Sequence, residues 1–253
     1  MDELSLGFAL LLGVLGLIAG VINTLAGGGS NLTIPALMIS GMPPDVANAT
    51  NRVGVMMQSV AGIKGFHDHG RLPTHDLKGI LVPTLLGGLL GGAVASYAPV
   101  HILKPALLLT MLAMAGLMLI KPSLVAPEPG TPTKQVSGTP GAWTALFAAG
   151  FYGGFVQAGV GFVLIAALAG TLRYDLVATN ALKIACTFAF TLVALAIFIV
   201  NDQVAWVPGL ILAAGSTVGA MLAVKVSIKV APKTLKWFLF VMTLVAVAAA
   251  LLR

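Results

Sequence analysis

The chain has 253 residues, of which 58% are hydrophobic and only 9% are charged, and its formal net charge is +6. This composition excludes a soluble domain and is typical of an integral membrane protein. The length leaves room for one membrane domain and no separate soluble one. Because the cations are spread over short loops with no aromatic residues between them, we expect no nucleic-acid partner and use them as markers of membrane topology.

A helix that spans a membrane needs about 20 mostly apolar residues. Clear candidates, several of them short, follow one another along the chain: 79–98, 104–120, 184–200, 204–224 and 237–252. Three regions fit less simply: 5–41, with three consecutive glycines, 45–63, which contains Arg52, and 141–171, which is uncharged and rich in glycine. The Pro-rich stretch 121–139 is interpreted as a cytoplasmic linker. It separates a first membrane repeat, 1–120, from a second, 140–253.

The two halves resemble each other in sequence. The first half reads GLIAGVINTLAGGGSNL and then ANATNRV, and the second reads GFYGGFVQAGVGFVL and then VATNALK. The matching positions are Gly16 and Gly150, Gly20 and Gly154, Asn23 and Gln157, Gly27 and Gly161, and the triplets 49–51 and 178–180. Internal repeats of this kind are typical of secondary transporters. The glycines at positions 16 and 20 are interpreted as contacts between packed helices.

Positive charge predicts how the halves are oriented, since cytoplasmic loops are enriched in lysine and arginine. The loops Lys64–Lys78 and Lys225–Lys236 are both basic, so we expect both in the cytoplasm, with an even number of crossings between them. The four clean spans between these loops already satisfy that condition. We therefore expect 141–171 to enter and return on one side, with its tip at Gln157–Gly161. By the repeat, 5–41 does the same, with its tip at Thr24–Ser30.

The predicted fold is an all-α polytopic membrane protein built from two inverted repeats. Each repeat has one broken or re-entrant helical hairpin and three transmembrane helices, hence an odd number of crossings, which inverts the second half relative to the first. The N-terminus and the C-terminus are then both outside. The sequence leaves open whether 5–41 is a true re-entrant hairpin or a broken spanning helix.

The stretch NTLAGGGSNLTIP, 23–35, places glycines and polar side chains at membrane depth. Backbone that is not helical survives there only when it is buried in protein or lines a wet cavity. We expect Ser30 or Asn31 to cap the returning half-helix, leaving its positive dipole end directed at the turn. Such an end favours an anion.

Cations and amides supply the remaining candidate groups. Arg52 and Lys183 each lie near the start of the span that follows a hairpin, where they either meet an anion or extend to the interface. Asp45 and Asp175 are interpreted as helix N-caps, so no carboxylate remains in mid-membrane to carry a proton or sodium ion. Gln58 matches nothing in the second half and is interpreted as structural. The predicted substrate-binding residues are Asn23, Thr24, Gly28, Gly29, Ser30, Asn51, Arg52, Gln157, Asn180 and Lys183.

The motifs NTLAGGGSNLTIPAL and GMPPDVANATN, with a second copy that ends in ATN, resemble the sulfite exporter TauE/SafE family. The resemblance covers nearly the whole chain, although the second copy departs from the family's glycine-rich, polar turn with QAGVGF. It implies a multi-pass carrier in the bacterial inner membrane that exports small organic or inorganic anions. Such anions often contain sulfur, as in sulfite, sulfoacetate and related sulfonates.

We therefore expect a secondary transporter that works by alternating access around the two hairpin tips, with no catalytic residue, metal or cofactor. Its expected partners are a small anion and the lipid bilayer, and a homo-oligomer stays open. The alternatives are an intramembrane hydrolase with Ser30 as nucleophile and a membrane assembly factor. The hydrolase lacks a base, because the four histidines fall in loops or at span ends and no HExxH spacing occurs.

Overall fold

The computed structural model describes residues 6–25, 27–120 and 131–226. The predicted span 237–252, most of the second basic loop and part of the linker lie outside the described residues. Within the described ranges all regular structure is helical, as predicted. Four of the described helices are long and apolar enough to cross a membrane: α1 (Leu6–Leu25), α4 (Leu77–Tyr97), α8 (Leu176–Val200) and α9 (Trp206–Val226).

The remaining elements complete two similar series. In the first half these are α2 (Ser30–Ile39), α3 (Pro44–Asp68) and α5 (Val100–Ile120). In the second half they are α6 (Ala142–Phe155), α7 (Val160–Ile165) and a π-helical stretch, η1 (Ala166–Thr171). Although α3 has 25 residues, enough to span, its buried face is polar, with Asn48, Thr50, Asn51 and Arg52 inside the protein.

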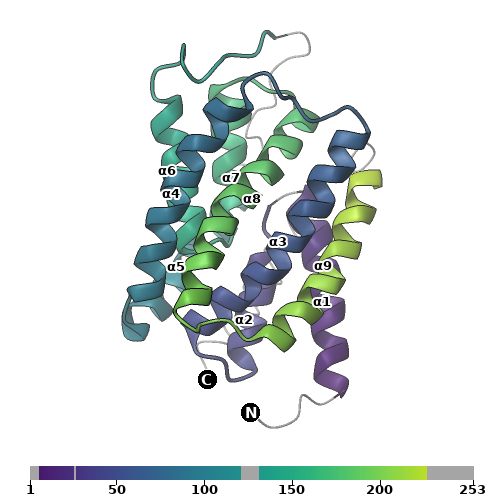
Figure 1. The fold of residues 1–253 in the computed structure, drawn as a ribbon, viewed down its shortest axis with the longest axis vertical. Helices are drawn as coiled ribbons and strands as arrows, with labels where there is room; N and C mark the ends of the chain where they lie inside the picture. Colours follow the sequence, from purple (N-terminus) through teal and green to yellow (C-terminus); the bar gives the residue numbers. More distant parts are fainter. Residues whose placement is uncertain (1–5, 26, 121–130, 227–253) are drawn as a thin grey trace.

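The helices form two hairpins that open toward opposite ends of the molecule (Figure 1). The helix α1 rises from the lower end and α2 returns to it, whereas α6 and α7 do the same from the upper end. Contacts repeat with the halves exchanged: α1 packs on α9 and α6 on α4, while α3 packs on α9 and α8 on α4. The helices α3 and α8 also contact each other. Two related halves predict this pattern, while their inverted orientation in a membrane stays a prediction.

The hairpin tips touch each other at two glycines. Gly27, with φ of +85°, and Gly161 approach so closely that a Cβ added to either would lie 2.3 Å from the other's Cα. The N–H of Gly161 also donates to the carbonyl of Gly27 at 3.3 Å. Only glycine fits such an approach, which explains why this matched pair of the repeat contains no side chain.

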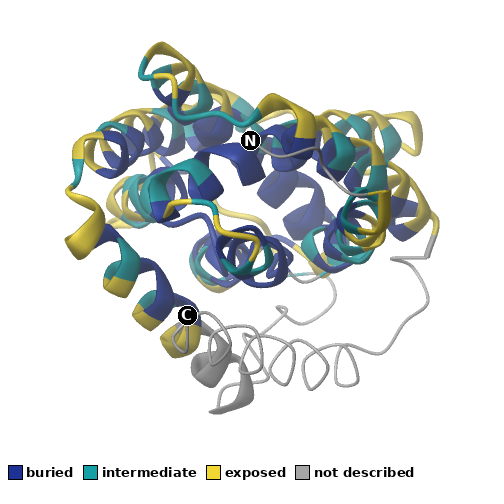
Figure 2. Cartoon of the chain, turned by 90° about the horizontal axis from the view of Figure 1, so that it is seen from below, coloured by how far each residue is buried: buried dark blue, intermediate teal, exposed yellow. Residues whose placement is uncertain are grey.

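Small residues also set the distance between packed helices. A Cβ at Gly20 would lie 2.2 Å from the carbonyl oxygen of Ser216 on α9, and one at Gly154 would lie 2.3 Å from that of Gly88 on α4. Both glycines therefore serve packing, which for Gly20 is the role interpreted from the sequence. Buried residues face the centre of the bundle, and exposed residues, many of them large and apolar, lie on its periphery (Figure 2). That distribution suits a protein surrounded by lipid.

The two basic loops begin at the same end of the fold. The last turns of α3 and α9 are neighbours there, since a Cβ at Gly65 would meet the side chain of Val224 at 3.0 Å. Lys225 belongs to the last turn of α9, and Lys64 directly precedes the last turn of α3. The described part of the chain therefore places the starts of the two loops side by side, and the number of crossings between them and the side of the membrane they face stay predictions.

One of the two predicted aspartate caps is wrong. Asp175 is the N-cap of α8, where its Oδ1 accepts from the N–H groups of Val177 and Ala178, both at 2.9 Å. The N-cap of α3 is Pro43, because the two prolines start that helix earlier. Asp45 lies in the first turn, where Oδ2 accepts a long hydrogen bond of 3.4 Å from Nε2 of Gln203.

Candidate functional site

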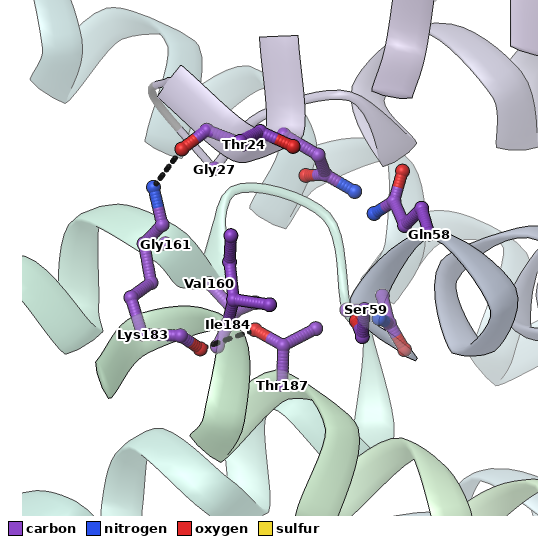
Figure 3. Close-up of a pocket in the computed structure, with 11 residues that line it drawn as sticks. Thr24, Gly27, Gln58, Ser59, Val160, Gly161, Lys183, Ile184 and Thr187 are labelled. Atoms are coloured by element: carbon purple, nitrogen blue, oxygen red, sulfur yellow. Dashed lines mark hydrogen bonds between the residues drawn. The ribbon is translucent and has the colours of Figure 1, made fainter. Parts of the chain in front are cut away.

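A pocket lies where the two hairpin tips meet (Figure 3). The first half contributes Asn23, Thr24, Gly27, Gln58 and Ser59, and the second half contributes Gln157, Val160, Gly161, Lys183, Ile184 and Thr187. We call this space the tip pocket. It is narrow, with room for about one water molecule.

Equivalent residues of the two halves face each other across the tip pocket. Asn23 and Gln157 are one matched pair of the repeat, and Gly27 and Gly161 are another. Gln58 and Thr187 form a third pair, because each follows the asparagine of its ATN triplet by seven residues, which is two helical turns. The sequence comparison missed this pair because an amide and a hydroxyl look unlike each other, although the spacing identifies it.

A second pocket adjoins the first at the start of α2. It shares Asn23 and Gln58 with the tip pocket, and it is also lined by Gly29, Ser30, Thr33 and Asn51. The Nδ2 of Asn51 donates to Oγ of Ser30 at 3.0 Å, and Oγ1 of Thr33 donates to Oδ1 of Asn51. Asn51 therefore attaches the first turn of α2 to α3.

The predicted caps of α2 are wrong. Gly29 occupies the N-cap position, and neither Ser30 nor Asn31 caps the helix through its side chain. Instead the Oδ1 of Asn23, at the end of α1, accepts from the N–H of Gly29 at 3.0 Å. The buried side chain of Asn31 has no hydrogen-bond partner in the described part of the chain. The turn is short enough for α1 to supply the cap across it, so the helix needs none of its own.

Arg52, which is fully buried, binds the end of a helix that belongs to the other half. Its guanidinium donates to the carbonyl oxygens of Gly153, at 3.0 Å, and Gly154, and to Oε1 of Gln157. It also lies 5.0 Å from the ring centroid of Phe198. Carbonyls in the last turn of a helix lack intrahelical partners and form its negative end. Arg52 neutralises that end of α6, leaving only its buried Nε–H unpaired.

Lys183, in the second half, binds the end of a helix that belongs to the first half. Its ammonium group donates to the carbonyl oxygen of Thr24, in the last turn of α1, at 3.1 Å, and to Oδ1 of Asn180 at 2.8 Å. An ammonium has three N–H donors, and the described residues accept from two of them. Unlike Arg52, Lys183 lines the tip pocket (Figure 3). Each half thus provides the cation that completes the broken helix of the other.

Burial excludes the alternative in which these cations extend to the membrane interface. Arg52 is 0% exposed and Lys183 is 1% exposed. No carboxylate lines either pocket in the described part of the chain. A buried ammonium without a nearby carboxylate is a favourable environment for an anion.

The structure gathers the ten predicted substrate-binding residues around the two tips but does not place all of them in one cavity. Four of them line the tip pocket: Asn23, Thr24, Gln157 and Lys183. Asn23 also lines the adjoining pocket, together with Gly29, Ser30 and Asn51. Gly28, Arg52 and Asn180 line neither pocket. Of these, Arg52 holds Gln157 and Asn180 holds Lys183.

The surroundings of Ser30 do not favour a hydrolase. Its hydroxyl accepts a hydrogen bond from the Asn51 amide, and an amide cannot take a proton from a nucleophile. Among the described residues no group of three or more His, Cys, Asp or Glu side chains is arranged to hold a metal ion.

The chain is similar to known membrane transporter proteins over most of its length. The chain is 29% identical over 223 residues to a "probable membrane transporter protein" of Haemophilus influenzae, covering 88% of this chain and 86% of that protein. It is 27% identical over 245 residues to the Escherichia coli K12 "probable membrane transporter protein YfcA", covering 96% and 90%. The family model of the sulfite exporter TauE/SafE proteins matches residues 12–251. The chain therefore belongs to the sulfite exporter TauE/SafE family of membrane transporters, not to an enzyme family.

Proposed function

We propose that this membrane transporter is a secondary carrier of small anions and exports sulfur-containing oxyanions or organosulfonates, such as sulfite or sulfoacetate. The observation that carries the proposal is the tip pocket, where the described residues accept only two hydrogen bonds from the buried ammonium of Lys183 and no described carboxylate is present. The name of the family supports the choice of sulfur oxyanions. The carrier works in the bacterial inner membrane with its Lys64–Lys78 loop in the cytoplasm and both termini outside.

The predicted residues divide into two roles. Lys183 attracts the anion, and the side chains of Asn23, Thr24 and Gln157 contact it in the tip pocket. The others build the walls: Gly28, Gly29, Ser30 and Asn51 position the start of α2, Asn180 positions Lys183, and Arg52 positions Gln157. Hydrogen bonds from amides and an ammonium suit the oxygens of a small oxyanion.

Alternating access follows from the position of the pocket between the halves. A narrow pocket between two tips opens when one half tilts against the other, and opposite tilts expose it at opposite ends. The buried cations then keep their helix ends neutralised, because each side chain can follow the backbone that it binds. The narrow state corresponds to a point between the two openings.

Counterflow into proteoliposomes tests the proposal. Labelled sulfite and sulfoacetate should exchange through the wild type, with acetate as a carboxylate control that exchanges less. Lys183→Met should lower that exchange at least tenfold, because the anion loses its charged partner. Lys64→Met is the matched control, since Lys64 is exposed, lines neither pocket and pairs with Asp68 at 2.8 Å. Wild-type vesicles that exchange neither sulfur anion would refute the proposed function, and equal exchange by Lys183→Met would remove Lys183 from the site.

A further inference from the structure

We propose that Gln58 binds the transported anion directly and selects oxyanions over halides. This inference rests on the proposed function and adds a residue that the motifs do not identify. Gln58 lies on α3, two turns after Asn51, and it lines both the tip pocket and the adjoining pocket. Gln58 therefore lies at the junction of the two pockets.

The amide of Gln58 has no hydrogen-bond partner among the described residues, although the residue is only 5% exposed. The other polar side chains around it are occupied. Gln157 accepts from Arg52 and donates to Oγ1 of Thr191 at 3.2 Å, and Ser59 donates to the carbonyl of Val55 at 2.7 Å. A buried amide without a partner destabilises a protein, so an amide that stays free in a pocket points to a ligand.

The position of Gln58 relative to Lys183 defines the class of ligand. Figure 3 shows the two side chains on opposite sides of the tip pocket, with Gln58 reaching toward the wall that contains Thr24 and Gly27. An oxyanion presents separate oxygens, so one can accept from the ammonium while another accepts from the amide N–H. A halide has a single acceptor centre and cannot satisfy the two walls in the same way.

The equivalent position in the second half carries no free amide. Thr187 occupies it, and its hydroxyl donates to the carbonyl of Lys183 at 2.8 Å within α8. The pocket thus has a charged wall from the second half and a neutral amide wall from the first. This asymmetry requires an anion that accepts a hydrogen bond on the side away from its charged partner.

Gln58→Met tests the inference because methionine keeps the length of the side chain and removes the amide. The half-saturating concentration of sulfite in counterflow should rise about tenfold or more, since a hydrogen bond to a charged ligand is lost. The ratio of that value to the inhibition constant of bromide, which is below one for a site that prefers oxyanions, should rise toward one. The melting temperature without anion should stay unchanged or rise, because an unpaired amide leaves the interior.

Gln203→Met is the matched control, because Gln203 follows the end of α8 and lines neither pocket. Gln203 donates to the carbonyl of Ser96 at 3.0 Å and accepts from its hydroxyl at 2.6 Å. Its replacement should lower the melting temperature and leave the half-saturating concentration unchanged, the reverse of the result for Gln58. The inference is overturned if Gln58→Met melts lower and binds sulfite as the wild type does. A wild type that neither exchanges sulfite nor is stabilised by it overturns the anion site itself, and Gln58 with it.

Discussion

Replacing Arg52 with methionine should destabilise the protein rather than weaken anion binding alone. The carbonyl oxygens of Gly153 and Gly154 and the Oε1 of Gln157 would lose a charged donor while staying buried. Each buried acceptor left without a partner costs about 1–3 kcal/mol, and breaking a buried charged network costs about 3–5 kcal/mol. We therefore expect the free energy of unfolding to fall by roughly 3–5 kcal/mol, and the melting temperature by about 10 °C.

The assay is thermal unfolding in detergent with and without sulfite, alongside counterflow at a temperature where the variant is folded. Arg52→Lys is the control, because it keeps the charge but has no planar fork and reaches fewer of the carbonyls. Its melting temperature should lie between those of the wild type and the methionine variant. The contrary result is an Arg52→Met variant that has the melting temperature of the wild type and loses only its stabilisation by sulfite. That result would make Arg52 an anion ligand and would refute its proposed role in stabilising the end of α6.

Three further predictions concern the tips and the topology. Lys183→Met should abolish stabilisation by sulfite and also lower the melting temperature, and a variant still stabilised by sulfite would contradict a direct contact. Gly161→Ala should lower the free energy of unfolding by about 1–3 kcal/mol, since its Cβ would lie 2.3 Å from the Cα of Gly27; a melting temperature equal to that of wild type would contradict the tip contact. Because Cys186 is buried, cysteines introduced at Gly70 and Asp202 can be labelled selectively. A membrane-impermeant maleimide should reach Gly70→Cys from the cytoplasm and Asp202→Cys from outside, and labelling of both from one side would refute the inverted topology.

Much of the fold could be predicted because apolar length and helix breaks are local properties. The predicted span 79–98 corresponds to α4, Leu77–Tyr97, and the predicted span 204–224 corresponds to α9, Trp206–Val226. The first tip was predicted through the repeat, and residues 27–29 lie between α1 and α2 as expected. The second tip lacks such a run, and there Gln157 and Gly159 both adopt positive φ, 68° and 73°. The second hairpin was predicted instead from the even number of crossings required between the two basic loops, which is a long-range argument.

The partners of the buried cations could not be predicted from the sequence. The carbonyls at the end of a helix and a bound anion are both negative, so a buried cation beside a break suits either one. Arg52 and Gly153 are 101 residues apart, and nothing local indicates that they meet. The structure alone separates Lys183, which faces the pocket, from Arg52, which does not.

Gln58 shows the converse difficulty. A comparison of residue types found no counterpart and indicated a structural role. Position along the helix was the better guide, because a spacing of seven from the ATN asparagine places Gln58 and Thr187 on equivalent faces. In this repeat the equivalent positions on the helices are kept, although the residue types differ. At the position of Gln58 and Thr187 that difference gives the two walls of the pocket different functions.

The reciprocal binding of helix ends has a consequence for how the protein is made. The carbonyl of Thr24 has its charged partner 159 residues later in the chain, so the ribosome delivers α1 to the membrane long before Lys183. During that interval the broken end of α1 must be met by water or by the insertion machinery, because lipid offers no donor. The broken end of α1 therefore gains its charged partner only after α8 has been made.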